Sequence, residues 1–214
     1  MTDTWGDLTR FGIGLFALLN PFTKLPYMLG IASGAGNRAV LTMAASATVA
    51  AMCMLLFMHV LGEPVLIALG TSLPSFQVGG GMVILLAGLR MLKDAPPPGA
   101  SGLAHVDRSR GFFIRMGISP LGTPMLAGAG AISKVIIETQ PHYGIDDAIL
   151  LAAVIVAVCL LCGLVLASAT MLMRLLGASF LAILARLAGL VIVAVGVEVM
   201  SKGVMAHARN FAGS

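Results

Sequence analysis

The sequence predicts an all-α, polytopic membrane protein: six transmembrane helices in two inverted three-helix repeats, with the first and fourth helices broken. Composition is the first observation, because 58% of the 214 residues are hydrophobic and 10% are charged, whereas soluble domains carry about 25% charged residues. The second is the length of the uncharged apolar stretches, several of which exceed the roughly 20 residues that a helix needs to cross a bilayer. The third is a proline-containing break in each half of the chain.

The first span is expected over residues 9–31, and two prolines, Pro21 and Pro26, interrupt it. Each proline removes a backbone N–H and clashes with the preceding turn, and Asn20 is pushed toward extended geometry because a proline follows it. Lys24 lies between the two prolines, and a charge is costly in lipid unless it has a partner. Two interpretations remain open: a kinked helix whose Lys24 reaches the membrane surface, and a discontinuous helix that lines a polar site.

The remaining spans are expected at residues 39–62, 67–92, 112–137, 148–173 and 179–203. The span over residues 112–137 has its own break at Ser119-Pro120, with a second proline at Pro124. The segment between the third and fourth spans is polar and rich in proline and glycine, which is typical of a linker. The expected domains are a first repeat over residues 1–93, a cytoplasmic linker over 94–111 and a second repeat over 112–214.

Three segments of the first half match segments of the second half in the same order. The breaks match at 20–26 and 119–124, the turns at 69–72 and 176–179, and the following helical segments at 77–80 and 186–189. Three spans in each half require the second half to be inserted upside down. Inverted repeats with matching broken helices are typical of secondary transporters, whose sites lie near the bilayer midplane. Chance similarity between Pro/Gly-rich membrane sequences is the alternative.

A broken helix has free N–H groups at one half-helix end, which suit a carboxylate, and free carbonyls at the other, which suit a cation. A zwitterionic amino acid could use both ends. The predicted substrate-binding residues are Asn20, Pro21, Thr23, Lys24, Gln77, Ser119, Pro120, Thr123 and Arg186. Lys24 and Arg186 would add charge-assisted hydrogen bonds to a carboxylate. The alternative for Arg186 is a side chain that reaches the cytoplasmic interface.

Lysine and arginine residues at the segment ends predict the orientation of the chain. The side that holds the central linker carries seven of them: Arg38, Arg90, Lys93, Arg108, Arg110, Arg115 and Arg174. The opposite side carries four: Arg10, Lys134, Lys202 and Arg209. The linker is therefore expected in the cytoplasm and both termini in the periplasm or outside the cell. These positions account for most of the basic residues, so the net charge of +4 does not indicate nucleic-acid binding.

No feature of the sequence indicates an enzyme. The chain has no Walker motif, zinc-ligand spacing or nucleophile–base pair, so no catalytic residue, metal or cofactor is expected. His59 and Glu63, four residues apart, are expected to form a helix interface rather than bind a metal. The C-x-x-C pair Cys159 and Cys162 leaves open thiol–disulfide exchange. Packing as small apolar side chains, together with Cys53, is the favoured interpretation.

Three stretches resemble the MarC family, also described as the neutral amino acid transporter family: LFALLNPFTKLP (15–26), LGTSLPSFQVGGG (69–81) and PLGTPMLAGAGAI (120–132). The resemblance covers nearly the whole chain. It implies a six-span protein of the bacterial inner membrane that moves small neutral amino acids with an ion gradient. The chain departs from the family pattern at 22–24, at Gln77 where the family usually has arginine, and at 128–130 where it usually has Gly-Pro-Gly.

The expected function is therefore an ion-coupled secondary transporter that imports or exports small amino acids or related small metabolites. Its expected partners are the lipid bilayer, a small-molecule substrate and a coupling proton or sodium ion, and no nucleic acid. A channel-like or non-transporting membrane protein is the alternative. A membrane thiol redox carrier is the third interpretation and rests only on the C-x-x-C pair.

Overall fold

A computed structural model describes residues 4–32, 34–68, 70–93, 109–139 and 145–212, and every regular element in these ranges is helical. Four segments are long and apolar enough to cross a bilayer, namely Gly6–Ala32, Asn37–Gly62, Asp146–Ala167 and Gly189–Arg209. The all-helical membrane class is therefore confirmed. The structure differs from six uniform spans in two places: the third span has only a shorter apolar helical stretch, Pro74–Leu89, and the fourth is divided into several pieces.

The first half begins with a helix in two parts, α1 (Thr4–Leu19) and α2 (Pro21–Ala32), joined at Asn20. Helix α3 (Asn37–Ala68) then continues beyond the expected end of the second span, and α4 (Leu73–Lys93) follows. The expected third span began at residue 67, but residues 67 and 68 belong to α3. Gly70, at φ +63°, turns the chain between the two helices, because glycine adopts this left-handed conformation without steric cost.

The second half begins with a helix in three parts, α5 (Arg110–Met116), the wide-turned η1 (Gly117–Leu126) and α6 (Ala129–Glu138). Ser109 caps α5, because its side chain accepts a hydrogen bond from the N–H of Phe112. Helix α7 (Ile145–Ala167) and the long α8 (Ala169–Ala212) complete the chain. Helix α8 changes direction at Gly177, where φ is +72°. The candidate span Gly189–Arg209 lies in the part of α8 after this kink.

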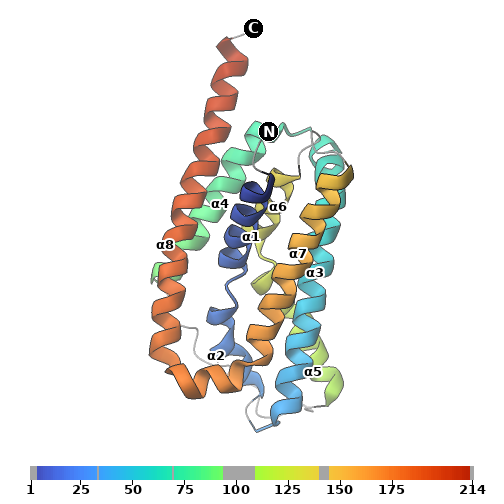
Figure 1. The fold of residues 1–214 in the computed structure, drawn as a ribbon, viewed down its shortest axis with the longest axis vertical. Coiled ribbons are helices and arrows are strands. Elements are labelled where there is room, and N and C mark those ends of the chain that lie inside the picture. The colour runs from blue at the N-terminus through green and yellow to red at the C-terminus, as the bar shows by residue number, and fades with distance from the viewer. Residues whose placement is uncertain (1–3, 33, 69, 94–108, 140–144, 213–214) are drawn as a thin grey trace.

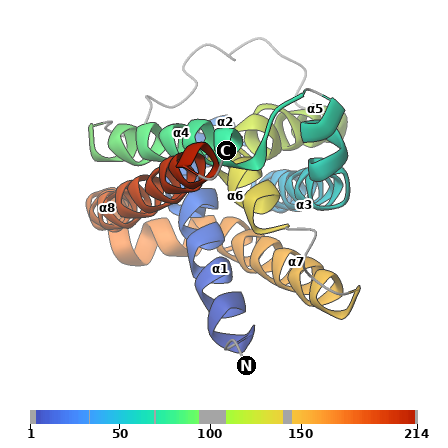
Figure 2. The ribbon, with the colours of Figure 1, turned by 90° about the horizontal axis from the view of Figure 1, so that it is seen from above.

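The helices form a bundle with the chain ends marked N and C at the same end (Figure 1). Seen from that end, α4 and α8 lie together at one edge, α3, α5 and α7 lie toward the other, and α6 lies between them (Figure 2). Large apolar side chains remain on the outer surface: Ile13, Val60, Leu164 and Leu175 are 65–70% exposed. In a membrane protein such side chains face lipid. The expected central linker falls mostly at residues 94–108, outside the described residues.

Glycines bring the backbones of α4 and α8 into direct contact. A Cβ atom added at Gly81 would lie 2.6 Å from the backbone nitrogen of Met200, and one added at Gly88 would lie 2.7 Å from that of Val193. The order of these contacts makes the two helices antiparallel. Close approach through small residues is the usual way in which membrane helices gain packing energy. A Cβ added at Gly79, in contrast, would have no neighbour within 4 Å.

Candidate functional site

The first break is closed by side chains of its own segment. Asn20 is 1% exposed and has a left-handed backbone, with φ at +35°. Lys24 is half-buried, and its Nζ donates a hydrogen bond to the carbonyl oxygen of Leu19 at 2.9 Å. Thr23 Oγ1 donates to the carbonyl oxygen of Asn20 at 3.0 Å. A cation is favoured at a helix C-terminus, so the Lys24 ammonium stabilises the end of α1 and lies at the break, as the discontinuous-helix interpretation expects.

The second break has the same kind of contact without the charge. Ser119 and Thr123 both have extended backbones inside η1, with φ/ψ of −139°/128° and −133°/122°. Thr123 Oγ1 donates to the carbonyl oxygen of Ile118 at 3.1 Å. In both breaks, therefore, a side chain donates to the carbonyl five residues earlier, and this carbonyl belongs to the residue just before the X-Pro pair. A lysine fills this position in the first break and a threonine in the second.

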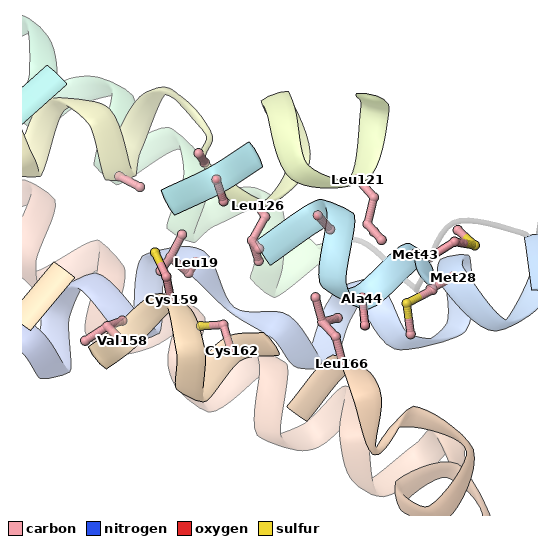
Figure 3. Close-up of a cluster of buried hydrophobic side chains, with 14 of the residues drawn as sticks. Leu19, Met28, Met43, Ala44, Leu121, Leu126, Val158, Cys159, Cys162 and Leu166 are labelled. Atoms are coloured by element: carbon pink, nitrogen blue, oxygen red, sulfur yellow. The ribbon is translucent and has the colours of Figure 1, made fainter. Parts of the chain in front are cut away.

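The two breaks lie in different surroundings. The end of α1 packs against the start of α6, since a Cβ added at Gly130 would lie 3.2 Å from Leu18 Cδ2. Leu19 and Leu126 both belong to the buried apolar cluster that also holds Cys159 (Figure 3). The Ser119 side of η1 instead packs on α3: a Cβ added at Gly122 would lie 2.9 Å from the carbonyl oxygen of Ala47. Ser119 itself is exposed.

The two other predicted site residues lie away from the breaks. Gln77 is half-buried on α4 and lines a cleft at the end of the bundle that carries the termini. Arg186 is exposed on α8. The predicted site residues therefore fall into two groups and two separate positions. The first break holds Asn20, Pro21, Thr23 and Lys24, and the second holds Ser119, Pro120 and Thr123. Gln77 and Arg186 belong to neither break.

The cleft that Gln77 lines has six charged residues in its lining and was not predicted from the sequence. It has a volume of about 390 Å³ and lies between α1, α4, α6 and α8. We call it the terminal cleft and define it by its polar lining residues, which are Asp7, Arg10, Gln77, Lys134, Glu138, Glu198 and Lys202. Three cations face three anions, so the cleft carries both signs of charge and no net formal charge.

Three ion pairs organise the charges of the terminal cleft, each within one helix. Lys134 Nζ lies 3.3 Å from Glu138 Oε2, Lys202 Nζ lies 2.9 Å from Glu198 Oε1, and Arg10 lies 3.9 Å from Asp7. The Lys134–Glu138 pair is the most buried, with side chains 13% and 27% exposed. The sequence placed Arg10, Lys134 and Lys202 at segment ends. The lysine–glutamate spacing of four on two different spans is the signal that could have drawn attention to these ion pairs.

The His59 side chain connects three helices, α3, α6 and α7, through its two ring nitrogens. Its Nδ1 lies 2.9 Å from Thr139 Oγ1, and its Nε2 lies 3.1 Å from the carbonyl oxygen of Ala148. Helix α3 is thereby joined to the end of α6 and the start of α7. The side chain of Glu63 lies outside the described residues. No cluster of three metal-ligating side chains occurs in the described ranges.

The cysteines pack as apolar side chains. Cys159 and Cys162 on α7 are fully buried in the apolar cluster, in contact with the helices around the first break (Figure 3). Cys53 lies on the outer surface of α3, and all three thiols are free. A buried thiol in apolar surroundings is poorly reactive, which favours the packing interpretation.

The family model described as "MarC family integral membrane protein" matches residues 5–207. The chain belongs to the MarC family. This MarC-family chain is 25% identical to a "UPF0056 membrane protein" of Aquifex aeolicus, which aligns over 95% of this chain and 97% of the relative. No solved structure matches it.

Two further relatives of this MarC-family chain carry similar names. The "UPF0056 membrane protein YhcE" of Escherichia coli is 28% identical over 91% of this chain and 90% of its own length. The "UPF0056 inner membrane protein MarC" of Salmonella typhimurium is 27% identical over 94% of this chain and 96% of its own length. These names agree with an integral membrane protein, and none of the three states what the relative transports or binds.

Proposed function

We propose that this MarC-family protein is an ion-coupled secondary transporter of small amino acids or related small metabolites across the bacterial inner membrane. The observation that carries the proposal is the pair of broken helices, each closed by a side chain that donates to the carbonyl five residues earlier. Irregular backbone inside a membrane is tolerated only where protein or a polar cavity covers it. Paired discontinuous helices are the usual substrate and ion sites of secondary transporters.

The proposal includes two inverted three-helix repeats. Three features support it besides the matching breaks: Gly70 and Gly177 both have positive φ in the turns that precede the third and sixth spans, α4 and α8 are antiparallel, and glycines of both form their contact. The two halves would then be related by an axis in the membrane plane. Alternating access would follow from movement of one half against the other.

Lys24 is the residue proposed to respond to substrate. Without substrate, its ammonium is held by the carbonyl of Leu19. A carboxylate is a stronger hydrogen-bond partner for an ammonium than a neutral carbonyl is. A substrate carboxylate can therefore bind the Lys24 ammonium and break its hydrogen bond to the carbonyl at the end of α1. The released carbonyls of Leu19 and Asn20 can then accept from a substrate ammonium or coordinate the coupling cation. Binding would thus change the local structure at the joint between α1 and α2.

Uptake into proteoliposomes tests this function. The purified protein would be reconstituted and given single radiolabelled small amino acids under an imposed proton or sodium gradient. We expect gradient-dependent accumulation of at least one of them, loss of this accumulation in Lys24→Met, and little change in Arg174→Met. Arg174 is the matched control because it is an exposed cation of α8 outside both breaks.

Two outcomes would contradict the proposal. Passive flux that equilibrates without the gradient would favour the channel-like alternative. Accumulation by Lys24→Met at the wild-type rate would remove Lys24 from the substrate site.

A further inference from the structure

We propose that the terminal cleft is a second binding site, in which a small zwitterion is held with its carboxylate on Lys134 and its ammonium on Glu198. This inference rests on the transport function proposed above and locates a site that the substrate would occupy outside the broken helices. The terminal cleft is separate from the two breaks in its residues, since none of its lining residues belongs to 19–24 or 118–123.

Lys134 is built into the cleft as a fixed cation. Its side chain is 13% exposed, and its Nζ lies 5.4 Å from the centre of the Phe11 ring, within cation–π range. Gly14 makes room for it, because a Cβ there would lie 2.9 Å from Lys134 Cε. The ammonium has three N–H donors, and the ion pair with Glu138 engages one of them. A ligand carboxylate can therefore bind Lys134 while the Glu138 pair stays intact.

Glu198 supplies the opposite charge from another helix. Its Oε1 pairs with Lys202, and a carboxylate has a second oxygen that can accept. Lys134 and Glu198 line the same cavity, so the cation of α6 and the anion of α8 face one ligand-sized space. The Glu198–Lys202 pair is about two-thirds exposed. Such exposed pairs contribute little to stability, so a ligand can replace Lys202 as the partner of Glu198.

The rest of the cleft suits a small ligand. Its volume of about 390 Å³ lies near the lower end of the roughly 300–1,000 Å³ found for small-molecule sites. Between the charged groups the walls are apolar, formed by Phe11, Ile137, Val191 and Val195. Opposite charges with apolar walls between them are complementary to an amino acid with a short side chain. A simple anion or cation would satisfy only one half of the site.

A surface that merely pairs its own charges is the competing explanation, and the position of Lys134 argues against it. A lysine in an ordinary surface pair extends into solvent, whereas this one is held between an aromatic ring and a glycine. The three pairs also come from three helices and converge on a single cavity. A zwitterion that joins Lys134 to Glu198 would link α6 to α8, and through α8 to the tightly packed α4.

Direct binding to the full-length protein in nanodiscs tests the inference without any transport step. Isothermal titration would use glycine, L-alanine and L-serine as zwitterions, and N-acetyl-L-alanine and L-alaninamide as probes that each lack one charge. We expect at least one zwitterion to bind, and both single-charge probes to bind at least about tenfold more weakly, because each loses a charge-assisted hydrogen bond.

Substitutions assign the binding to the cleft. Lys134→Met and Glu198→Gln should each weaken binding at least about tenfold, and Lys134→Arg should retain most of it because the charge is kept. Arg174→Met and Asp146→Asn, matched exposed substitutions outside the cleft, should leave it unchanged. Because Glu198 is largely exposed, its variant is expected to fold even if Lys134→Met does not.

Three results would overturn the inference: no binding of any of the three zwitterions, equal binding of the single-charge probes, or wild-type affinity in both cleft variants. Its failure is distinguishable from failure of the transport function. Uptake that depends on Lys24, without binding that depends on Lys134 and Glu198, would leave transport standing and remove this site. Binding that depends on Lys134 and Glu198, without any uptake, would support this site and contradict the transport function.

Discussion

In each of the two breaks a side chain donates a hydrogen bond to a backbone carbonyl, but the donor group differs. Each break leaves a carbonyl just before an X-Pro pair, and each has a side chain five residues further on that donates to this carbonyl. In the first break the donor is the ammonium of Lys24 beside the buried Asn20, and in the second it is the hydroxyl of Thr123 beside the exposed Ser119. A hydroxyl is enough to close a break, so the charge of Lys24 is not needed for structure alone. The difference points to Lys24 as the functional member of the pair.

The largest expected effect comes from making the first break resemble the second. Lys24→Thr keeps a hydroxyl donor at the same position and removes the charge. We expect the protein to insert and fold, and transport in proteoliposomes to fall at least about tenfold, because a charge-assisted bond to the substrate carboxylate is worth about 1.5–3 kcal/mol. Lys24→Arg should keep part of the activity, since a planar fork replaces a compact charge. Undiminished transport by Lys24→Thr would make the two breaks functionally alike.

A smaller effect is expected from the backbone of the first break. Asn20 has φ at +35°, and a left-handed conformation costs L-residues roughly 1–2 kcal/mol, with asparagine more tolerant than most. Asn20→Ala should therefore lower the free energy of unfolding by about 1 kcal/mol or more, and Asn20→Gly should be the more stable of the two variants. Unfolding in mixed micelles followed by circular dichroism measures both. Equal stability of the two would show that backbone strain at Asn20 is negligible.

The threonine hydroxyl groups that donate to backbone carbonyls should contribute similar amounts to the free energy of unfolding in the two breaks. Thr123→Val removes the hydroxyl that bonds to Ile118, and Thr23→Val removes the one that bonds to Asn20, at nearly constant volume. Each should lower the free energy of unfolding by about 0.5–1.5 kcal/mol, the usual net value of one hydrogen bond. The same unfolding assay applies. A much larger loss in only one variant would show that the two breaks differ in structural importance as well as in charge.

The smallest effect is expected at Ser119. Its backbone is extended, with φ at −139°, a conformation open to any residue, and its side chain is exposed. Ser119→Ala should change the free energy of unfolding by less than about 0.5 kcal/mol, in contrast to Asn20→Ala. Reduced transport by Ser119→Ala at unchanged stability would place Ser119 in the substrate path. Both breaks would then contribute to transport.

The places where the helices break follow largely from local sequence. Proline removes a backbone donor and restricts the residue before it, and Pro21 and Pro120 mark the two breaks. The expected interruption at Pro26 is absent, because Pro26 lies inside α2. The membrane class follows in the same way from composition and from the length of the apolar stretches. Glycines at 79–81 and at Gly189 are small residues of the kind that allow membrane helices to approach closely, and the structure has such a contact at Gly81.

Tertiary structure decided which of the polar residues meet. From the sequence alone, Arg186 and Lys24 were both predicted to bind a substrate carboxylate, but Arg186 is exposed on α8. The sequence assigned Lys134 and Lys202 to segment ends, but the crossing of α1, α4, α6 and α8 gathers them in one cleft. The physical reason is that a break depends on a few neighbouring residues, whereas a cleft depends on the rotation and tilt of four helices. That rotation is set by close packing between α4 and α8, where a single added Cβ would collide with the opposite backbone.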